Sequence, residues 1–197
     1  MTWNEVRLAA LQKMFSSDGA AINEHDEAVQ QYLAMMPQAA NEGAGLLLAA
    51  GFGLRRAEDI CTGGQCTADL AAELPRLWPG APLELYRKGK NGTLIRADGA
   101  VLTAGRFLRL PGGGPVLAVY TSRPRAFGMD TPPDEPVELE EQGAALLPLY
   151  MASQLYKDDD ITIAAQYRNE FEAALERLTP AAAELQRGSF TSVSGWV

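Results

Sequence analysis

Two apolar helical segments joined by a short acidic break restrict the fold of this chain most, and they lie between Ala144 and Leu178. Each segment repeats its apolar residues with the spacing of one face of an α-helix. The break runs from Lys157 to Asp160, and because it is short the two helices are expected to fold back on each other. Asp160 is the predicted N-cap of the second helix, where negative charge is favourable. The sequence therefore predicts an antiparallel helical hairpin.

Both helices of the predicted hairpin carry aromatic residues on their apolar faces. Such a stripe is more often core between paired helices than a ligand site, but a buried tyrosine keeps a hydroxyl that can serve an interface. Core is favoured over subunit interface for these rings. The first face contains Leu146, Leu149, Tyr150, Ser153 and Tyr156, widened by Met151 and Leu155. The second contains Ile161, Ala164, Ala165, Arg168, Phe171 and Leu175.

The hairpin also follows a more specific pattern, LLPLY-A-QLY-DDD-A-QY-NEFE-L. This pattern is carried by Leu147, Pro148, Leu149, Tyr150, Ala152, Gln154, Leu155, Tyr156, Asp158, Asp159, Asp160, Ala164, Tyr167, Asn169, Glu170, Phe171, Glu172 and Leu175. It resembles the C-terminal helical pair of the head–tail adaptors of tailed phages, the connector or tail tubular protein A-like family. The resemblance is clearest over residues 119–178. It implies a structural protein that forms a ring under the portal and extends the DNA channel toward the tail.

The composition excludes several other classes of protein. With 47% apolar residues, the chain can bury a core, and it has no run of 18 uncharged apolar residues that could span a membrane. Its net charge of −8 argues against a protein whose main task is to grip phosphate backbones, although DNA could still pass along its surface. Residues 1–5 lack the basic and apolar regions of a secretory signal, so none is expected.

Two helices are predicted before residue 53. Thr2 and Glu5 form a capping box for the first, and Asn23 is the predicted N-cap of the second. Pro37 should kink the second helix or start a new one, and Gly51 should end it. The expected buried stripes are Trp3, Val6, Ala10, Leu11, Met14 and Phe15 in the first helix, and Val29, Tyr32, Leu33 and Met36 in the second.

The middle of the chain has frequent proline and glycine and short apolar runs, which favour an antiparallel sheet or a small sandwich. Asn91-Gly92 and Asp98-Gly99 are predicted hairpin turns, and Pro111–Pro115 is a third turn. Residues 69–77 could instead form one short helix. The expected strands are residues 83–86, 93–97, 100–102, 106–110 and 116–121. The basic tip of the first hairpin, interpreted as solvated rather than as a binding site, consists of Arg87, Lys88 and Lys90.

The side chains that could carry chemistry are few and poorly arranged. His25, the only histidine, is expected to be exposed near a helix start, and no serine lies in a G-x-S-x-G motif. Cys61 and Cys66 could pair in an oxidising medium, but free thiols are favoured, and with one histidine they cannot close a four-ligand zinc site. Asp158–Asp160 lacks the spacing of a calcium loop, and Gly89-Lys90 lacks the rest of a phosphate loop. We therefore expect no cofactor, no metal and no enzymatic activity.

Together these patterns predict an α+β fold in which a helical body is interrupted by an antiparallel β insertion. The predicted parts are N-terminal helices at 1–53, a β-rich insertion at 54–141, the helical hairpin at 142–178 and an extended tail at 179–197. Within the tail, residues 180–187 could form a short helix. Phe190 and Trp196 follow in a Ser- and Gly-rich stretch that is either a solvated end or a peptide that orders on docking to a partner.

By resemblance, the protein is expected at the head–tail junction of the virion after assembly in the host cytoplasm. Its expected partners are further copies of itself in a ring, the phage portal and a downstream tail or nozzle protein, while DNA passes the lumen without specific binding. The alternative is a small soluble module whose β part binds a ligand or carbohydrate, and a monomer at high concentration would favour it. The predicted subunit or portal interface consists of Tyr150, Tyr156, Tyr167, Phe171, Phe190 and Trp196.

Overall fold

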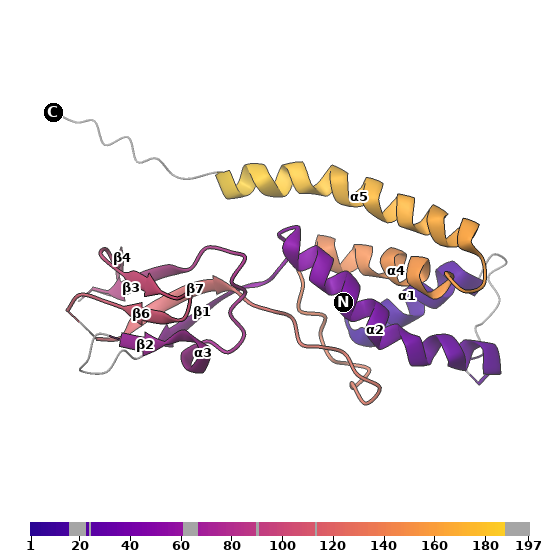
Figure 1. Ribbon diagram of the computed structural model, residues 1–197, viewed down its shortest axis with the longest axis horizontal. Helices are drawn as coiled ribbons and strands as arrows, with labels where there is room; N and C mark the ends of the chain where they lie inside the picture. The colour runs from indigo at the N-terminus through magenta and orange to yellow at the C-terminus, as the bar shows by residue number, and fades with distance from the viewer. Residues whose placement is uncertain (16–22, 24, 61–66, 90, 113, 188–197) are drawn as a thin grey trace. The chain divides into compact units, whose positions relative to one another are not determined.

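The chain forms two compact units, one helical and one β-rich (Figure 1). The helical unit comprises Met1–Phe52 and Ala126–Val197, and the β unit comprises Gly53–Arg125. An α+β fold with a helical body interrupted by a β insertion is thus confirmed, but the insertion ends at Arg125 and not at residue 141. The computed structural model describes residues 1–15, 23, 25–60, 67–89, 91–112 and 114–187, with the backbone alone for 28 and 180–187.

One helix of the helical unit, α4, packs against all three of the others (Figure 1). The four helices are α1 (Trp3–Phe15), α2 (Glu27–Ala49), α4 (Glu141–Leu155) and α5 (Ile161–Arg187). Because α4 has neighbours on several sides, it is buried nearly all round and has no single apolar stripe. Its buried residues are Gly143, Ala144, Leu146, Leu147, Pro148, Tyr150, Met151, Ala152, Ser153 and Leu155.

The first helix begins as the sequence predicts. The Thr2 backbone N–H donates to Glu5 Oε2 at 2.8 Å, and the Glu5 N–H donates to Thr2 Oγ1 at 3.3 Å. This reciprocal pair is the capping box. Phe15, expected to close the buried face, is more than one third exposed and lies edge-on to Tyr32 at a centroid distance of 5.4 Å. The other residues of the expected stripe are buried as predicted, namely Trp3, Val6, Ala10, Leu11 and Met14.

The start of α2 differs from the prediction, whereas its end agrees. The helix begins at Glu27, because the side chain of Asn23 bonds the N–H of His25, two residues on, and forms a local turn instead of a cap. One helix continues through Pro37, so no new helix starts there. At the end, the Gly51 N–H donates to Leu48 O at 3.1 Å and the next N–H, from Phe52, to Leu47 O at 3.0 Å. With Gly51 at φ 102°, this is a Schellman cap.

Helix α5 is longer than predicted and buries a narrower face. It runs from Ile161 to Arg187, so the backbone of residues 180–187 continues it and forms no separate helix. Ala164 and Phe171 are buried, but Ile161 and Ala165 are exposed. The main neighbour of this part of the helix is α4, and one main neighbour buries a stripe narrower than the six positions that the periodicity indicates.

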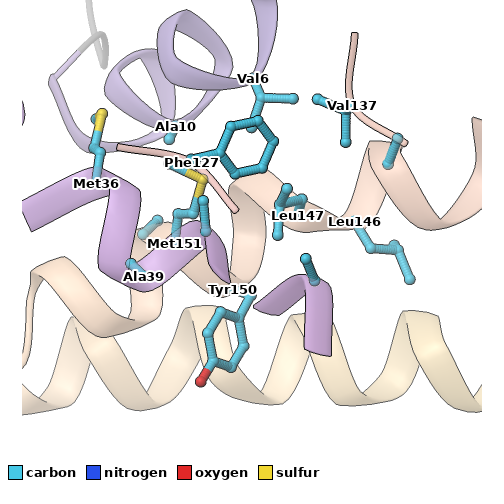
Figure 2. Close-up of a cluster of buried hydrophobic side chains, with 14 of the residues drawn as sticks. Val6, Ala10, Met36, Ala39, Phe127, Val137, Leu146, Leu147, Tyr150 and Met151 are labelled. Carbon is cyan, nitrogen blue, oxygen red and sulfur yellow. The ribbon is translucent and has the colours of Figure 1, made fainter. Parts of the chain in front are cut away.

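The connector that precedes α4 belongs to the helical unit, which explains the corrected boundary. The ring of Phe127 stacks on Trp3 at a centroid distance of 4.4 Å. The Asn41 side chain donates to Phe127 O at 2.9 Å and accepts from Phe127 N at 2.8 Å. Val137 and Leu139 are also buried. Figure 2 shows the ring of Phe127 among core side chains of the helices.

The β unit contains two antiparallel sheets, as the short strands predict. The described strands are β1 (Arg55–Ile60), β2 (Thr67–Asp69), β3 (Glu84–Lys88), β4 (Leu94–Arg96), β5 (Val101–Thr103), β6 (Phe107–Arg109) and β7 (Val116–Thr121). Their orders are β1-β7-β3-β4 and β2-β6-β5. Asp98-Gly99 is therefore a turn between two sheets and not a hairpin. The helix expected at 69–77 is shorter, since α3 spans Leu70–Glu73.

The core of the β unit is separate from that of the helical unit. It lies between inward-facing residues of both sheets and α3. The largest buried side chain is Tyr120, whose hydroxyl donates to Glu58 Oε1 at 2.7 Å. The buried members are Ile60, Ala68, Leu70, Leu74, Leu85, Ala97, Leu108, Leu110, Val116, Ala118 and Tyr120.

Candidate assembly surfaces

Two of the predicted interface rings meet inside the helical unit. Tyr150 on α4 points toward α5 (Figure 2), where its ring lies edge-on to Phe171 at 5.3 Å. The guanidinium of Arg168 lies 5.4 Å from the centre of the Tyr150 ring and 5.8 Å from that of Phe171. Burial raises the pKa of Tyr150, the nearby carboxylate of Glu42 raises it further, and Arg168 opposes both. This cluster fastens α4 to α5.

The other two predicted rings fasten the hairpin to α1. Tyr156 and Tyr167 stack with their centroids 6.1 Å apart. The hydroxyl of Tyr156 donates to Met14 O at 2.6 Å, and that of Tyr167 donates to Lys13 O. These carbonyls lie in the last turn of α1, where backbone acceptors lack helical partners. Burial raises the pKa of both tyrosines, so the hydroxyls stay protonated donors through the neutral range.

The structure thus brings together four of the six predicted interface residues within one chain. Tyr150 and Phe171 are buried, and Tyr156 and Tyr167 are half-buried. This arrangement agrees with the favoured interpretation of the rings as core. An additional role at a subunit or portal interface stays a prediction. Phe190 and Trp196 lie outside the described residues, as do Cys61 and Cys66.

The acidic turn between α4 and α5 has a structural role. Asp160 Oδ1 accepts from the N–H groups of Thr162 at 2.8 Å and Ile163 at 3.2 Å, which confirms the predicted N-cap. Asp159 accepts a hydrogen bond from the hydroxyl of Tyr32, so the turn is also tied to α2. Asp158 is exposed and lines a groove next to this contact.

A groove of about 250 Å³ lies between α2 and the end of α4 and was not foreseen from the sequence. Its walls carry both charges and an exposed methionine, which is typical of a polar contact surface and not of an enclosed ligand site. Met35 is an exposed apolar residue outside the expected buried stripe of α2, and this is the signal that could have indicated the groove. Its lining residues are Met35, Gln38, Ala39, Glu42, Gln154, Leu155, Lys157 and Asp158.

Other side chains considered for chemistry have ordinary contacts. His25 is exposed. Lys88, on the basic hairpin tip, pairs with Asp59 at 2.7 Å, and Arg87 donates to the carbonyl of Pro111. Among the described residues, no three His, Cys, Asp or Glu side chains lie close enough together to hold a metal ion. Within the same residues, no helix is long and apolar enough to cross a membrane.

No family model matches the chain, and no curated protein matches it.

Proposed function

We propose that this protein is a head–tail adaptor of a tailed phage, a non-enzymatic virion protein that forms a ring between the portal and the tail. In this proposal it assembles in the host cytoplasm and binds further copies of itself, the portal and a downstream tail or nozzle protein. Its work is assembly, in which each copy presents one surface to its neighbour in the ring and others to the portal and tail.

The observation that carries the proposal is the position of the adaptor-like sequence pattern in the fold. The pattern forms α4, the acidic turn and α5, and α4 is the helix around which the unit is built. The acids of the pattern serve the turn through Asp159 and Asp160, and its rings tie the hairpin to α1. The pattern therefore specifies one defined hairpin, and the order of helices, β insertion and helices also agrees with the family.

The DNA channel of such a ring should repel rather than hold a passing duplex. The acidic side chains Glu170 and Glu172 are exposed on α5 and are candidates for the lumen. They bond to Gln166 at 3.2 Å and to Arg168 at 2.5 Å, so their positions on the helix are defined. Duplex DNA that meets carboxylates instead of cations releases no counterions and gains little affinity. We therefore expect passage of DNA without specific binding.

The test is attachment to phage heads. The purified chain is mixed with DNA-filled, tailless heads that carry a portal, and with portal-free proheads as the matched control. The number of copies bound to each head is measured after sedimentation. Native mass spectrometry measures the oligomeric state of the free chain. We expect many copies per portal-bearing head and none on the control. A chain that remains monomeric at high concentration and ignores both particles would refute the proposal and favour the ligand-binding module.

A further inference from the structure

Exposed apolar side chains are frequent on two edge strands of the β unit and next to them. They lie on β4, on β5 and at the start of β6, within a span of fourteen residues. Strands β4 and β5 are also the edges of their respective sheets. Large apolar side chains on sheet edges are costly in water and mark contact surfaces. We call this the β-edge surface, and its apolar residues are Leu94, Ile95, Val101, Leu102 and Phe107.

Basic side chains surround the β-edge surface. The strand register sets Lys88 opposite Leu94, Arg87 opposite Ile95 and Arg109 opposite Val101. The guanidinium of Arg106 lies 5.2 Å from the centre of the Phe107 ring, and Arg96 is exposed on β4 itself. The whole β unit has eleven Lys and Arg against six Asp and Glu, a net charge of +5. An apolar centre within a charged rim is the usual composition of a protein interface.

The helical unit has the opposite charge. It has six Lys and Arg against nineteen Asp and Glu, a net charge of −13, which with the +5 of the β unit makes the −8 of the chain. The acids are densest in the connector before α4, where residues 130–141 include six acids and no base. A surface on one copy is therefore electrostatically complementary to a surface on the next. These six acids are Asp130, Asp134, Glu135, Glu138, Glu140 and Glu141.

The connector also presents an apolar group on a fixed support. Met129 is 70% exposed, the largest exposure among the large apolar residues described. Beside it, the Gly128 N–H donates to Thr131 Oγ1 at 2.7 Å. The N–H groups of Asn4 and Trp3 donate to the carbonyls of Pro133 at 2.9 Å and Glu135 at 2.8 Å. Residues 128–135, the connector tip, are thus held against α1 with an apolar side chain displayed next to Asp130.

We propose that the β-edge surface of one copy binds the connector tip of a second copy. Met129 would lie against the apolar strands while Asp130 and Asp134 face the arginines around them. The two contacting surfaces are different, so the contact is head-to-tail, which is the kind of contact from which a closed ring is built. The inference rests on the proposed function, since it supplies the contact between neighbours in that ring. Duplex DNA is the competing occupant of a basic surface, and the test includes it.

Mixing of two complementary variants tests the contact. The β-edge variant carries Arg96→Glu and Arg109→Glu, and the tip variant carries Met129→Ser, Asp130→Asn and Asp134→Asn. Each alone should self-associate at least about tenfold more weakly than the parent chain. A one-to-one mixture should form a heterodimer and nothing larger, because it contains one intact surface of each kind. All five side chains are exposed, so unchanged melting temperatures should accompany the change.

The matched control removes the same kind of charge elsewhere on the helical unit. Glu170→Gln with Glu172→Gln on α5 should leave self-association as it is in the parent chain. Native mass spectrometry and sedimentation at low salt measure each protein and the mixture. Variants that assemble as the parent chain does would overturn the contact, and so would a mixture that stays monomeric. Tight, salt-dependent binding of duplex DNA that only the β-edge variant loses would assign the surface to nucleic acid instead.

The same samples separate this inference from the proposed function. If the mixture forms heterodimers but the parent rings do not bind portal-bearing heads, the contact stands and the adaptor role fails. If the parent chain and both variants load equally onto heads, the adaptor role stands and the contact is wrong.

Discussion

Phe171 shows how much one side chain does in the helical unit. It is 1% exposed and completes the aromatic cluster with Tyr150 between α4 and α5. Phe171→Ala should lower the free energy of unfolding by about 3–5 kcal/mol, because it leaves a cavity that the helices cannot fully close. The control is Ile161→Ala on the same helix, where the side chain is 69% exposed and the change should stay within about 0.5 kcal/mol. Urea unfolding measures both, and equal losses would contradict the assignment of Phe171 to the core.

Tyr120 gives the β unit a dependence on alkaline pH. Burial, followed by the hydrogen bond to Glu58, raises its pKa from 10.0 to about 12. The folded state thus favours the neutral phenol, so this stabilisation is full below pH 10 and is lost as the pH rises toward about 12. Tyr120→Phe should cost about 1 kcal/mol at pH 8, because the bond to Glu58 is lost. The substitution should also make the fall in the free energy of unfolding above pH 10 shallower.

Unfolding by urea at pH values from 8 to about 11.5 measures this effect. Tyr150, Tyr156 and Tyr167 also have raised pKa values, so some alkaline loss should remain in the variant. If the free energy of unfolding falls equally steeply with pH in the parent chain and in Tyr120→Phe, the fold does not raise the pKa of Tyr120.

The partners of individual residues were only partly predictable. The capping box and the Asp160 cap follow from local sequence, and both are present. The bonds from Tyr156 and Tyr167 to the end of α1 span more than 140 residues of sequence, and periodicity holds no information at that range. The same limit applies to the exposed tip at Met129, whose support is a set of bonds to the first helix.

At the scale of elements, close approach of α2 and α4 depends on one glycine. A Cβ at Gly43 would lie 2.7 Å from both Leu147 Cδ1 and Tyr150 Cδ1, whereas one at Gly45 would meet nothing within 4 Å. Gly43→Ala should destabilise the chain by about 1–3 kcal/mol through overpacking. Gly45→Ala should stabilise it by about 0.5–1 kcal/mol, since alanine is the better residue in a helix interior. Thermal unfolding of the two variants measures both, and shifts of the same sign would refute this packing.

The elements that the sequence predicted are those with a strong apolar period or a clear cap. Helices α1 and α5 and strand β7 fall in this class. Strand β1 was missed because its sequence, Arg55 to Ile60, is mostly charged, and its place beside β7 depends on pairing with residues 116–121. Strand β2 was missed because three residues are too few to show a period. The Asp98-Gly99 turn was placed correctly, but local sequence cannot tell a hairpin from a passage between sheets.

At the scale of the whole molecule, the separate cores of the two units predict separate unfolding. The chain passes between the units only at residues 52–53 and 125–126, and each unit closes its own buried cluster. Leu108 is 1% exposed in the β unit, as Phe171 is in the helical unit. Leu108→Ala should lower the free energy of unfolding of the β unit, and Phe171→Ala that of the helical unit, each by about 2–5 kcal/mol. Each variant should shift only its own calorimetric transition to lower temperature, and the double variant should show both shifts.

Calorimetry of the four proteins under conditions that keep the chain monomeric tests this independence, because assembly would otherwise couple the units through neighbouring copies. A single transition that moves as a whole in every variant would show that the units unfold together. Independence has a consequence for assembly. A β unit that folds by itself can bind a neighbouring copy through the β-edge surface without disturbing the helical unit. When the two variants are mixed, the β unit of the tip variant should unfold at a higher temperature, because its β-edge surface is intact and binds the other chain. The unfolding temperature of the β unit in the β-edge variant should not change.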